Sequence, residues 1–99
     1  MATLEITDGG LRDWQSFEID KSTTTIGRHG DFKTPRFQTE VSRIHCAIMH
    51  DGAGTYQVRD LNSFSGTSVN GKSIGTKSKS LHGGDKVSLG NHLTIMFSR

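Results

Sequence analysis

The chain has 99 residues, of which 31% are hydrophobic, a length that suits one domain with a thin core. Its formal net charge of +2 is too small for the strongly basic surface that is typical of nucleic-acid-binding domains. The single cysteine, Cys46, excludes an internal disulfide bond and suits a reducing compartment, so we expect one domain over residues 1–99.

Apolar residues alternate with polar ones along most of the chain, which is typical of strands with one buried face. In chain order, the predicted strands carry Leu4 and Ile6, Phe17 and Ile19, residues 23–26, Ile44, Cys46 and Ile48, Tyr56 and Val58, Val87 and Leu89, and Leu93, Ile95 and Phe97. No segment has helical periodicity. Turn signals recur at intervals of roughly 8–12 residues, so we predict an all-β fold, a two-sheet β-sandwich of roughly ten short strands.

Two segments depart from the alternation. Residues 29–38 contain the only proline, Pro35, which lacks an N–H group and excludes a central strand there. A long loop on a rigid sheet is often functional. Farther along, the pair Asn70-Gly71 predicts a two-residue hairpin turn, because both residue types tolerate a positive φ.

Polar motifs lie beside predicted strand ends at three separated places. Gly27-Arg28 ends the run of residues 23–26, Ser42 opens the strand that contains Cys46, and residues 63–71 form a glycine-containing loop. A bound phosphate requires a fixed cation and hydrogen-bond donors, and arginine offers two parallel N–H donors. The three motifs together therefore indicate a phosphate-binding site in loops at one end of the sandwich.

His45 follows Ser42 by three residues. If the strand already begins at Ser42, the two side chains point to opposite faces and do not meet as nucleophile and base. We therefore predict a structural role for His45, hydrogen-bonding to backbone beneath the loops. Cys46 is expected to be a small buried hydrophobe. The five histidines have no close ligand spacing, so neither a metal nor a cofactor is expected.

The order of these motifs resembles the forkhead-associated (FHA) domain family, β-sandwiches that bind phosphothreonine peptides. The family pattern is Gly-Arg, then Ser-x-x-His, then Asp-x-x-Ser-x-Asn-Gly-Thr-x-x-Asn-Gly, then Gly-Asp. The matching segments are Gly27-Arg28, residues 42–45, residues 60–71 and Gly84-Asp85, and the resemblance extends from about residue 19 to residue 97. It implies a phosphorylated protein partner downstream of a Ser/Thr kinase.

The resemblance also implies roles for individual residues. Arg28, Ser42 and Arg43 are expected to bind the phosphate, Arg43 through its backbone N–H or its side chain. The expected phosphopeptide contacts from the third loop are Phe64, Ser65 and Gly66, and the expected supporting residues are Gly27, His45, Thr67 and Asn70. Thr67 shapes the loop and Asn70 ties it down, while the peptide lies extended across the loop tips.

This chain departs from the family pattern at Ser65, where the family commonly has asparagine. That asparagine holds the backbone of the bound peptide and helps to form the pocket for the threonine methyl group. Serine is shorter, so phosphothreonine selectivity rests on fewer contacts here. Lys33, Arg36 and Arg43 are compatible with a preference for acidic residues after the phosphothreonine, and equally with solvated loop charges.

Other functions are considered beside phosphopeptide binding. The first is an FHA-like interaction scaffold that does not require phosphate. A hydrolase or phosphatase using Ser42 or Cys46 would need a nucleophile elbow, a metal cluster or paired carboxylates, none of which is apparent in the sequence. A single-stranded nucleic-acid binder would use Phe32, Phe37 and Phe64 beside Lys33 and Arg36, in predicted loops.

Location follows from what the sequence lacks. No apolar run approaches the roughly 18 residues of a membrane-spanning helix. Residues 1–6 have neither the basic nor the apolar region of a secretory signal. We therefore expect an intracellular, cytoplasmic protein whose partners include neither a membrane nor a nucleic acid.

Overall fold

The computed structural model describes residues 2–8, 16–91 and 93–99, and these form eleven strands and no helix. The strands are β1 (Ala2–Asp8), β2 (Ser16–Ile19), β3 (Thr23–Gly27), β4 (Phe32–Lys33), β5 (Cys46–His50), β6 (Tyr56–Asp60), β7 (Thr67–Val69), β8 (Lys72–Ser73), β9 (Lys79–Leu81), β10 (Lys86–Leu89) and β11 (Leu93–Ser98). The predicted all-β fold is confirmed.

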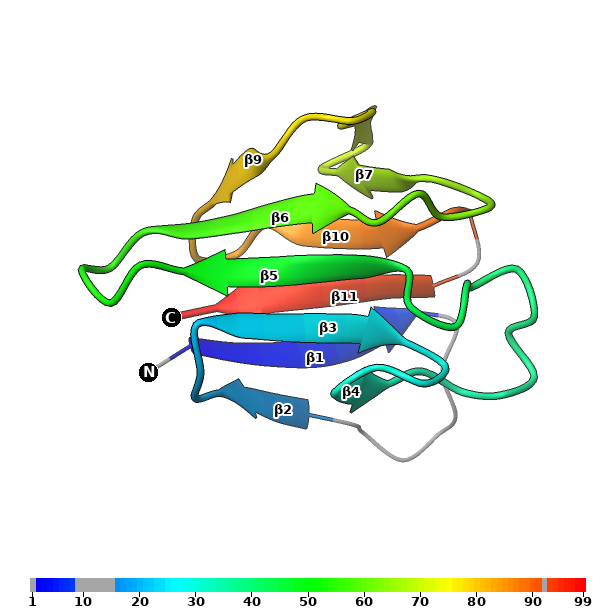
Figure 1. The fold of residues 1–99 in the computed structure, drawn as a ribbon, viewed down its shortest axis with the longest axis horizontal. Helices are drawn as coiled ribbons and strands as arrows, with labels where there is room; N and C mark the ends of the chain where they lie inside the picture. Colours follow the sequence, from blue (N-terminus) through cyan, green and yellow to red (C-terminus); the bar gives the residue numbers. More distant parts are fainter. Residues whose placement is uncertain (1, 9–15, 92) are drawn as a thin grey trace.

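The strands form two sheets that pack face to face (Figure 1). One sheet has the order β2-β1-β11-β10-β7-β8, and the other has the order β4-β3-β5-β6-β9. Neighbouring strands are antiparallel, except that β4 runs parallel to β3 at the edge of the second sheet. The fold is therefore the two-sheet sandwich that the turn spacing predicts.

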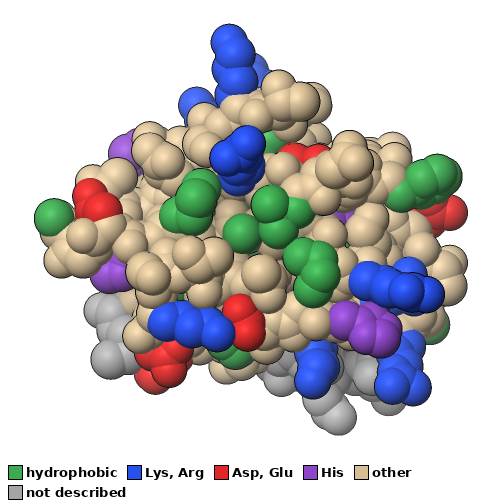
Figure 2. All heavy atoms as spheres, viewed as in Figure 1, with side chains coloured by type: hydrophobic (Ala, Val, Ile, Leu, Met, Phe, Trp, Pro, Cys, Tyr) green, Lys and Arg blue, Asp and Glu red, His purple; other side chains and the backbone are tan. Residues whose placement is uncertain are grey.

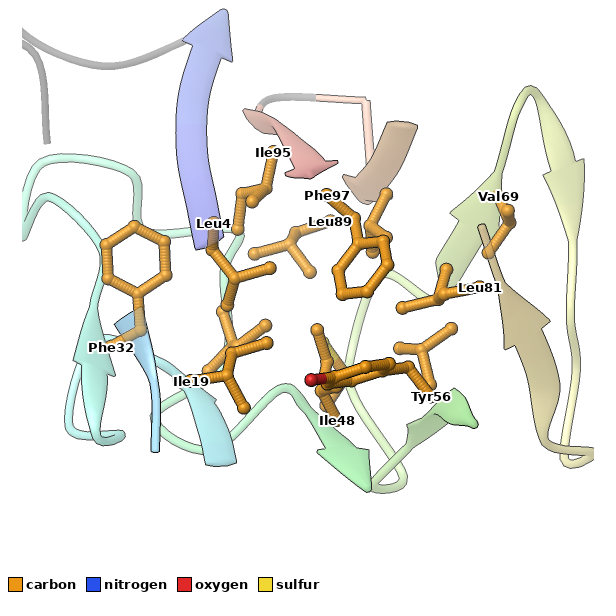
Figure 3. Close-up of a cluster of buried hydrophobic side chains, with 14 of the residues drawn as sticks. Leu4, Ile19, Phe32, Ile48, Tyr56, Val69, Leu81, Leu89, Ile95 and Phe97 are labelled. Atoms are coloured by element: carbon orange, nitrogen blue, oxygen red, sulfur yellow. The ribbon is translucent and has the colours of Figure 1, made fainter. Parts of the chain in front are cut away.

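The core lies between the two sheets and is built by the alternating apolar residues of both. Figure 3 shows labelled side chains from the two sheets pointing toward one another, among them Leu4, Ile48 and Phe97. Each of these three side chains is fully buried. Burying one such side chain stabilises the fold by about 1.5–3 kcal/mol, so the apolar alternation accounts for the pairing of the sheets.

Two predicted positions differ from the structure. Ile44 is 39% exposed, because β5 begins at Cys46 and the alternation does not extend back to residue 44. Phe32, expected in a loop, lies in β4, is only 4% exposed and stacks on Phe17 with ring centroids 5.5 Å apart. A short edge strand thus buries an aromatic ring that a nucleic-acid binder would have to expose.

The hairpin predicted at Asn70-Gly71 is confirmed. Val69 pairs with Lys72 across β7 and β8, which leaves two residues in the turn. Asn70 and Gly71 have φ angles of 51° and 86°, the left-handed values that a tight hairpin turn of this kind requires.

Candidate functional site

Three loops meet at one end of the sandwich, on the right of Figure 1. They are the β3–β4 turn, the long β4–β5 loop and the β6–β7 loop, and they carry the three polar motifs. The first two are joined by backbone bonds, because Arg28 N–H donates to the Ser42 carbonyl (3.2 Å) and His29 N–H to the Arg43 carbonyl (2.9 Å). Figure 2 shows Lys, Arg and His side chains gathered at this end of the molecule.

Gly27 allows the close approach of these two loops. It ends β3, and a Cβ atom at this position would lie 2.3 Å from the Arg43 carbonyl oxygen and 2.8 Å from that of Ser42. No side chain fits against backbone at these distances. The Gly-Arg pair is therefore a packing requirement, because the glycine lets Arg28 lie against the segment that contains Ser42.

The Arg28 side chain is half-buried and is held by the β4–β5 loop. Its Nε donates to the Val41 carbonyl oxygen at 2.7 Å, and Val41 is itself fully buried. Among the described residues, no hydrogen bond or ion pair involves the two terminal nitrogens of Arg28. One edge of the guanidinium is thus anchored, while its outer nitrogens keep their donors for a ligand.

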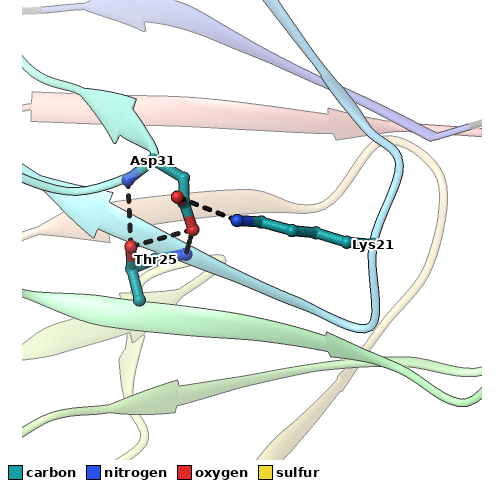
Figure 4. Close-up of polar contacts among 3 residues, drawn as sticks. All are labelled: Lys21, Thr25 and Asp31. Atoms are coloured by element: carbon teal, nitrogen blue, oxygen red, sulfur yellow. Dashed lines mark hydrogen bonds and ion pairs between the residues drawn. The ribbon is translucent and has the colours of Figure 1, made fainter.

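The turn that carries Arg28 is braced by Asp31 (Figure 4). The Asp31 carboxylate accepts hydrogen bonds from the N–H and hydroxyl of Thr25 (3.0 and 3.1 Å), and it pairs with Lys21 at 3.0 Å. The bonds from Thr25 and Lys21 lower the pKa of Asp31 to about 2. This carboxylate therefore holds the β3–β4 turn against β3.

Ser42 connects the second loop to the third. Its hydroxyl oxygen accepts a hydrogen bond from the Phe64 N–H at 2.9 Å. A hydroxyl that accepts one bond still has its own hydrogen to donate, so Ser42 keeps a donor for a ligand. The Ser42 N–H, by contrast, is already bound to His45 Nδ1 at 3.1 Å.

The premise that β5 begins at Ser42 is wrong, since the strand begins at Cys46 and residues 42–45 form a bend. Ser42 and His45 therefore do meet. They meet through the Ser42 backbone N–H, whereas the Ser42 hydroxyl oxygen faces the Phe64 N–H. The contact is consequently not the hydroxyl–imidazole bond of a nucleophile and its base.

His45 lies fully buried beneath the loops. Because Nδ1 accepts the Ser42 N–H, Nε2 carries the hydrogen and donates to the Gly66 carbonyl oxygen at 2.7 Å. Burial lowers the pKa of His45 below its ordinary value, against the opposing effects of the Gly66 carbonyl and Asp60. A neutral imidazole thus links the second and third loops.

Asp60 and Ser63 organise the third loop from within. Asp60 accepts hydrogen bonds from the Ser63 N–H (3.0 Å), the Ser63 hydroxyl and the Thr67 hydroxyl (2.7 Å). Partial burial raises the pKa of Asp60, but these bonds outweigh it and lower the pKa below its ordinary value. The Ser63 oxygen accepts the Gly66 N–H at 2.9 Å, which closes the loop on itself.

The outer part of the third loop contains Phe64 and Ser65. The Phe64 side chain is 86% exposed, and the Ser65 hydroxyl donates to the Glu40 carbonyl oxygen at 2.9 Å. On the facing β4–β5 loop, Phe37 is 57% exposed. Two aromatic rings therefore stand exposed, Phe37 on the loop that also carries Ser42 and Phe64 on the next loop.

Asn70 lies away from this loop, at the other end of β7. Its side chain donates to Asp85 (3.0 Å) and accepts from the Lys86 N–H (2.9 Å), so it ties the β7–β8 hairpin to β10. The remaining sequence-predicted residues, Gly27, Arg28, Ser42, Arg43, His45 and residues 64–67, lie on or directly beneath the three loops.

Some contacts of the site could not be predicted from the sequence. The carbonyl groups of Val41 and Glu40 hold Arg28 and Ser65, and any residue type supplies a carbonyl. Asp60 and Ser63 did leave a signal, because the spacing Asp-x-x-Ser is typical of a side chain that closes a turn on nearby N–H groups.

Within the residues that the structure describes, no three His, Cys, Asp or Glu side chains are placed to hold a metal ion, and His92 lies outside them. The described part of the chain also contains no helix long and apolar enough to span a membrane.

The chain matches known proteins over most of its length. The family model described as FHA domain matches residues 24–90. The glycogen accumulation regulator GarA of Mycolicibacterium smegmatis is 38% identical over 82 residues, which cover 83% of this chain and 50% of GarA. The chain thus spans about half the length of this curated relative.

Solved structures agree with this match. The FhaA FHA domain, in complex with the intracellular domain of Rv3910, is 32% identical with a TM-score of 0.83, covering 98% of this chain and 99% of that one. An FHA domain from a study of phosphothreonine-dependent FHA domain interactions is 32% identical with a TM-score of 0.85, covering 99% and 95%. The chain belongs to the FHA domain family.

Proposed function

We propose that this domain recognises phosphothreonine-containing segments of partner proteins in Ser/Thr kinase signalling. The observation that carries the proposal is the convergence of Arg28, Ser42 and the Gly66 loop at one end of an FHA-family sandwich. The relative from the study of phosphothreonine-dependent interactions supports the same assignment. The two sheets draw on residues 2–98, which supports a single domain.

Arg28 and Ser42 supply the phosphate contacts in this proposal. A phosphothreonine carries about −1.5 to −2 charges and three strong acceptor oxygens. The terminal nitrogens of Arg28 bind two of these oxygens in parallel, and the Ser42 hydroxyl donates to the phosphate group. The bond from Arg28 Nε to the Val41 carbonyl holds the guanidinium in place beforehand, which reduces the entropy lost on binding.

Neighbouring residues complete the proposed site. Arg43 is exposed beside Ser42 and adds a second positive charge near the phosphate. Phe64 and Ser65 contact the peptide on the outer side, with Gly66 holding the loop through its bond from His45. The peptide lies extended across the loop tips.

A binding role, rather than a catalytic one, is part of the proposal. Cys46 is fully buried, and burial raises the pKa of its thiol, so the reactive thiolate form is disfavoured. The Ser42 hydroxyl oxygen is bound to a backbone N–H and not to an imidazole base. A single buried cysteine also fits an intracellular location.

The test is a calorimetric titration with matched threonine and phosphothreonine peptides, repeated on Arg28→Ala. We expect binding that requires the phosphate and weakens roughly 10- to 150-fold in Arg28→Ala, because a charge-assisted hydrogen bond contributes about 1.5–3 kcal/mol. Arg99→Ala, which removes the same charge at the opposite end of the sandwich, is the matched control and should bind as the unmodified chain does.

One observation favours a second candidate, an interaction scaffold that does not require phosphate. Phe64, 86% exposed at the loop tip, offers an apolar contact that does not involve the phosphate. Equal binding of the threonine and phosphothreonine peptides, lost in Phe64→Ala and retained in Arg28→Ala, would establish the scaffold and reject the phosphate reader.

A further inference from the structure

A concave surface lies away from the three loops, where the two sheets of the sandwich end. It is a hollow of about 460 Å³ between the β7–β8 hairpin and β9. Residues that line it include Val69, Lys72, Ser73, Ile74, Lys77 and Lys79. β8 is the last strand of the six-stranded sheet and β9 the last strand of the five-stranded sheet, so the hollow lies between two sheet edges.

The charge of this hollow is strongly positive. Residues 61–84 contain three lysines and no aspartate or glutamate, in a chain whose net charge is only +2. Lys72, Lys77 and Lys79 are exposed, and within the described residues none of them has an ion-pair partner. Figure 2 shows Lys and Arg side chains at the top of the molecule, over the region of β7 to β9.

The carboxylate of Asp85, which is bound to the lining residue Asn70, does not neutralise the hollow. Asp85 accepts hydrogen bonds from Asn70 and from the His82 N–H (2.8 Å). These bonds, and weaker attractions to His82 and Lys79, lower the pKa of Asp85 below its ordinary value. The single negative charge of Asp85 does not balance the three lysines of the hollow, so the region keeps a net positive charge. Lys86 on β10 adds to this positive charge.

The two edges also provide groups that bind backbone. Among the described residues, no strand pairs with the outer edges of β8 and β9, so N–H and C=O groups along these edges are open to an added strand. Ile74, half-buried in the hollow, adds apolar surface. Long lysine side chains beside an open edge are a common protection against non-specific strand pairing, and the same arrangement selects for an acidic strand.

We propose that this hollow docks an extended, acidic polypeptide segment of a partner protein. The lysines supply the charge complementarity and the sheet edges supply the hydrogen bonds. A nucleic acid fits less well, because none of the described residues that line the hollow is aromatic and bases would have nothing to stack on there. The positive charge selects glutamate and aspartate side chains, and the open edge selects an extended backbone.

This inference goes beyond phosphopeptide recognition and does not depend on it. The hollow is separated from the Gly66 loop by β7, a strand of three residues that spans about 10 Å. A partner that carries a phosphothreonine and an acidic stretch at suitable spacing would engage both surfaces. The second contact would then be intramolecular, which raises the overall affinity without any new contact at the phosphate.

The test uses the whole chain and a ten-residue peptide of alternating glutamate and threonine, with a glutamine–threonine peptide of equal length as control. Amide chemical shifts are followed by NMR as each peptide is added at low salt. We expect saturable shifts in residues 72–81 with the glutamate peptide. The affinity should fall at least tenfold in the triple variant Lys72→Gln, Lys77→Gln, Lys79→Gln.

A charge-matched variant separates this site from general electrostatic attraction. Lys33→Gln, Arg59→Gln, Arg99→Gln removes three exposed cations elsewhere, none of which has an ion-pair partner among the described residues, and should retain the peptide. Arg28→Ala should also retain it, so that failure of the phosphate site and failure of this site are distinguishable. Shifts confined to the three loops, an equal loss in both triple variants, or equal binding of the glutamine peptide would overturn the proposal. Tighter binding of single-stranded DNA, or of phosphatidylserine vesicles, through the same lysines would also overturn it.

Discussion

At the scale of single residues, the site depends on one buried imidazole and one anchored guanidinium. His45 accepts from one loop and donates to the next, so it holds the Ser42 and Gly66 segments at a fixed separation. Arg28 is held by a bond to a carbonyl group rather than by an ion pair. The terminal nitrogens of Arg28 and the Ser42 hydroxyl thus remain available as hydrogen-bond donors. A phosphate requires donors that are held in place in this way.

The buried imidazole makes stability depend on pH. His45 has a pKa below its ordinary value in the folded chain, so the unfolded chain binds more protons between the two pKa values. The stabilisation is therefore fully present above about pH 6.5 and is lost as the pH falls below it, at up to about 1.4 kcal/mol per pH unit. Urea unfolding at several pH values between 7.5 and 5 measures this slope.

Substitution isolates the contribution of His45. His45→Gln should flatten the pH dependence in this window, whereas His82→Gln, at an exposed histidine, should keep the slope of the unmodified chain. An unchanged slope in His45→Gln would show that another group titrates. The carboxylates with lowered pKa values act in a separate window, because their stabilisation is lost only as the pH falls below about 4.

In the proposed function, the serine at position 65 is expected to limit the affinity for a phosphothreonine peptide. Its hydroxyl donates to the Glu40 carbonyl, so it joins two loops and has no second donor for a peptide. Ser65→Asn adds an amide that can both donate and accept. We expect up to roughly tenfold tighter binding of a phosphothreonine peptide, which corresponds to one hydrogen bond of about 0.5–1.5 kcal/mol.

Calorimetric titration of phosphothreonine and phosphoserine forms of one peptide measures the effect of Ser65→Asn. Ser63→Asn is not a suitable control, because Ser63 closes the loop on Asp60. Ser80→Asn, exposed on β9, introduces the same side chain far from the loops and should leave binding unchanged. Weaker or unchanged binding in Ser65→Asn would show that the Glu40 contact matters more than an added amide.

At the scale of elements, the backbone at the end of β3 lies directly against the backbone of the bend before β5. Gly27→Ala would place a methyl group 2.3 Å from the Arg43 carbonyl oxygen, and a backbone atom there cannot move aside alone. We expect a loss of about 3 kcal/mol of unfolding free energy, as for severe overpacking. Thermal and urea unfolding measure this loss.

A second glycine provides the control for Gly27→Ala. Gly52 lies in the exposed β5–β6 turn with φ of 79°, and an added Cβ there meets nothing within 4 Å. Gly52→Ala should cost about 1–2 kcal/mol, from the left-handed backbone alone. Equal losses in the two variants would mean that close approach at Gly27 contributes nothing beyond backbone conformation.

At the scale of the whole molecule, the two sheets bring loops that are distant in sequence to one end, with the cations of the loops beside one another. If the positive charge of these loops drives phosphopeptide binding, the binding affinity should fall as the salt concentration rises. It should also weaken below about pH 6, where the phosphate loses its second charge. We expect the dissociation constant to rise steadily between low and high salt.

Titrations in 50 mM and 500 mM salt, and at pH 7.5 and 5.5, measure both effects. Circular dichroism at each condition confirms that the chain remains folded, since His45 itself destabilises the fold in acid. A phosphothreonine affinity that does not change with salt would show that apolar contacts, such as those of Phe64, outweigh the charge.

Much of the fold could be predicted from the sequence, because strands show a local alternation of apolar and polar residues. The alternation in Leu93, Ile95 and Phe97, and the residue types in Asn70-Gly71, are each readable within a few positions, and the structure confirms them. The start of β5 was predicted too early, because Ile44 continues the alternation in sequence but lies in a bend. The pairing of Cys46 with Ile26 on one side and with Asp60 on the other shows where the strand begins.

The sequence by itself determined the fold class, the turns and the residue types that a phosphate site requires. Only the tertiary structure decided how they meet: Arg28 against the Val41 carbonyl, His45 between Ser42 and Gly66, and Asn70 against β10. It alone also placed the edges of β8 and β9 on either side of a basic hollow. The physical reason is that strand period and turn preference are local, whereas these contacts depend on sheet order and on backbone groups that every residue shares.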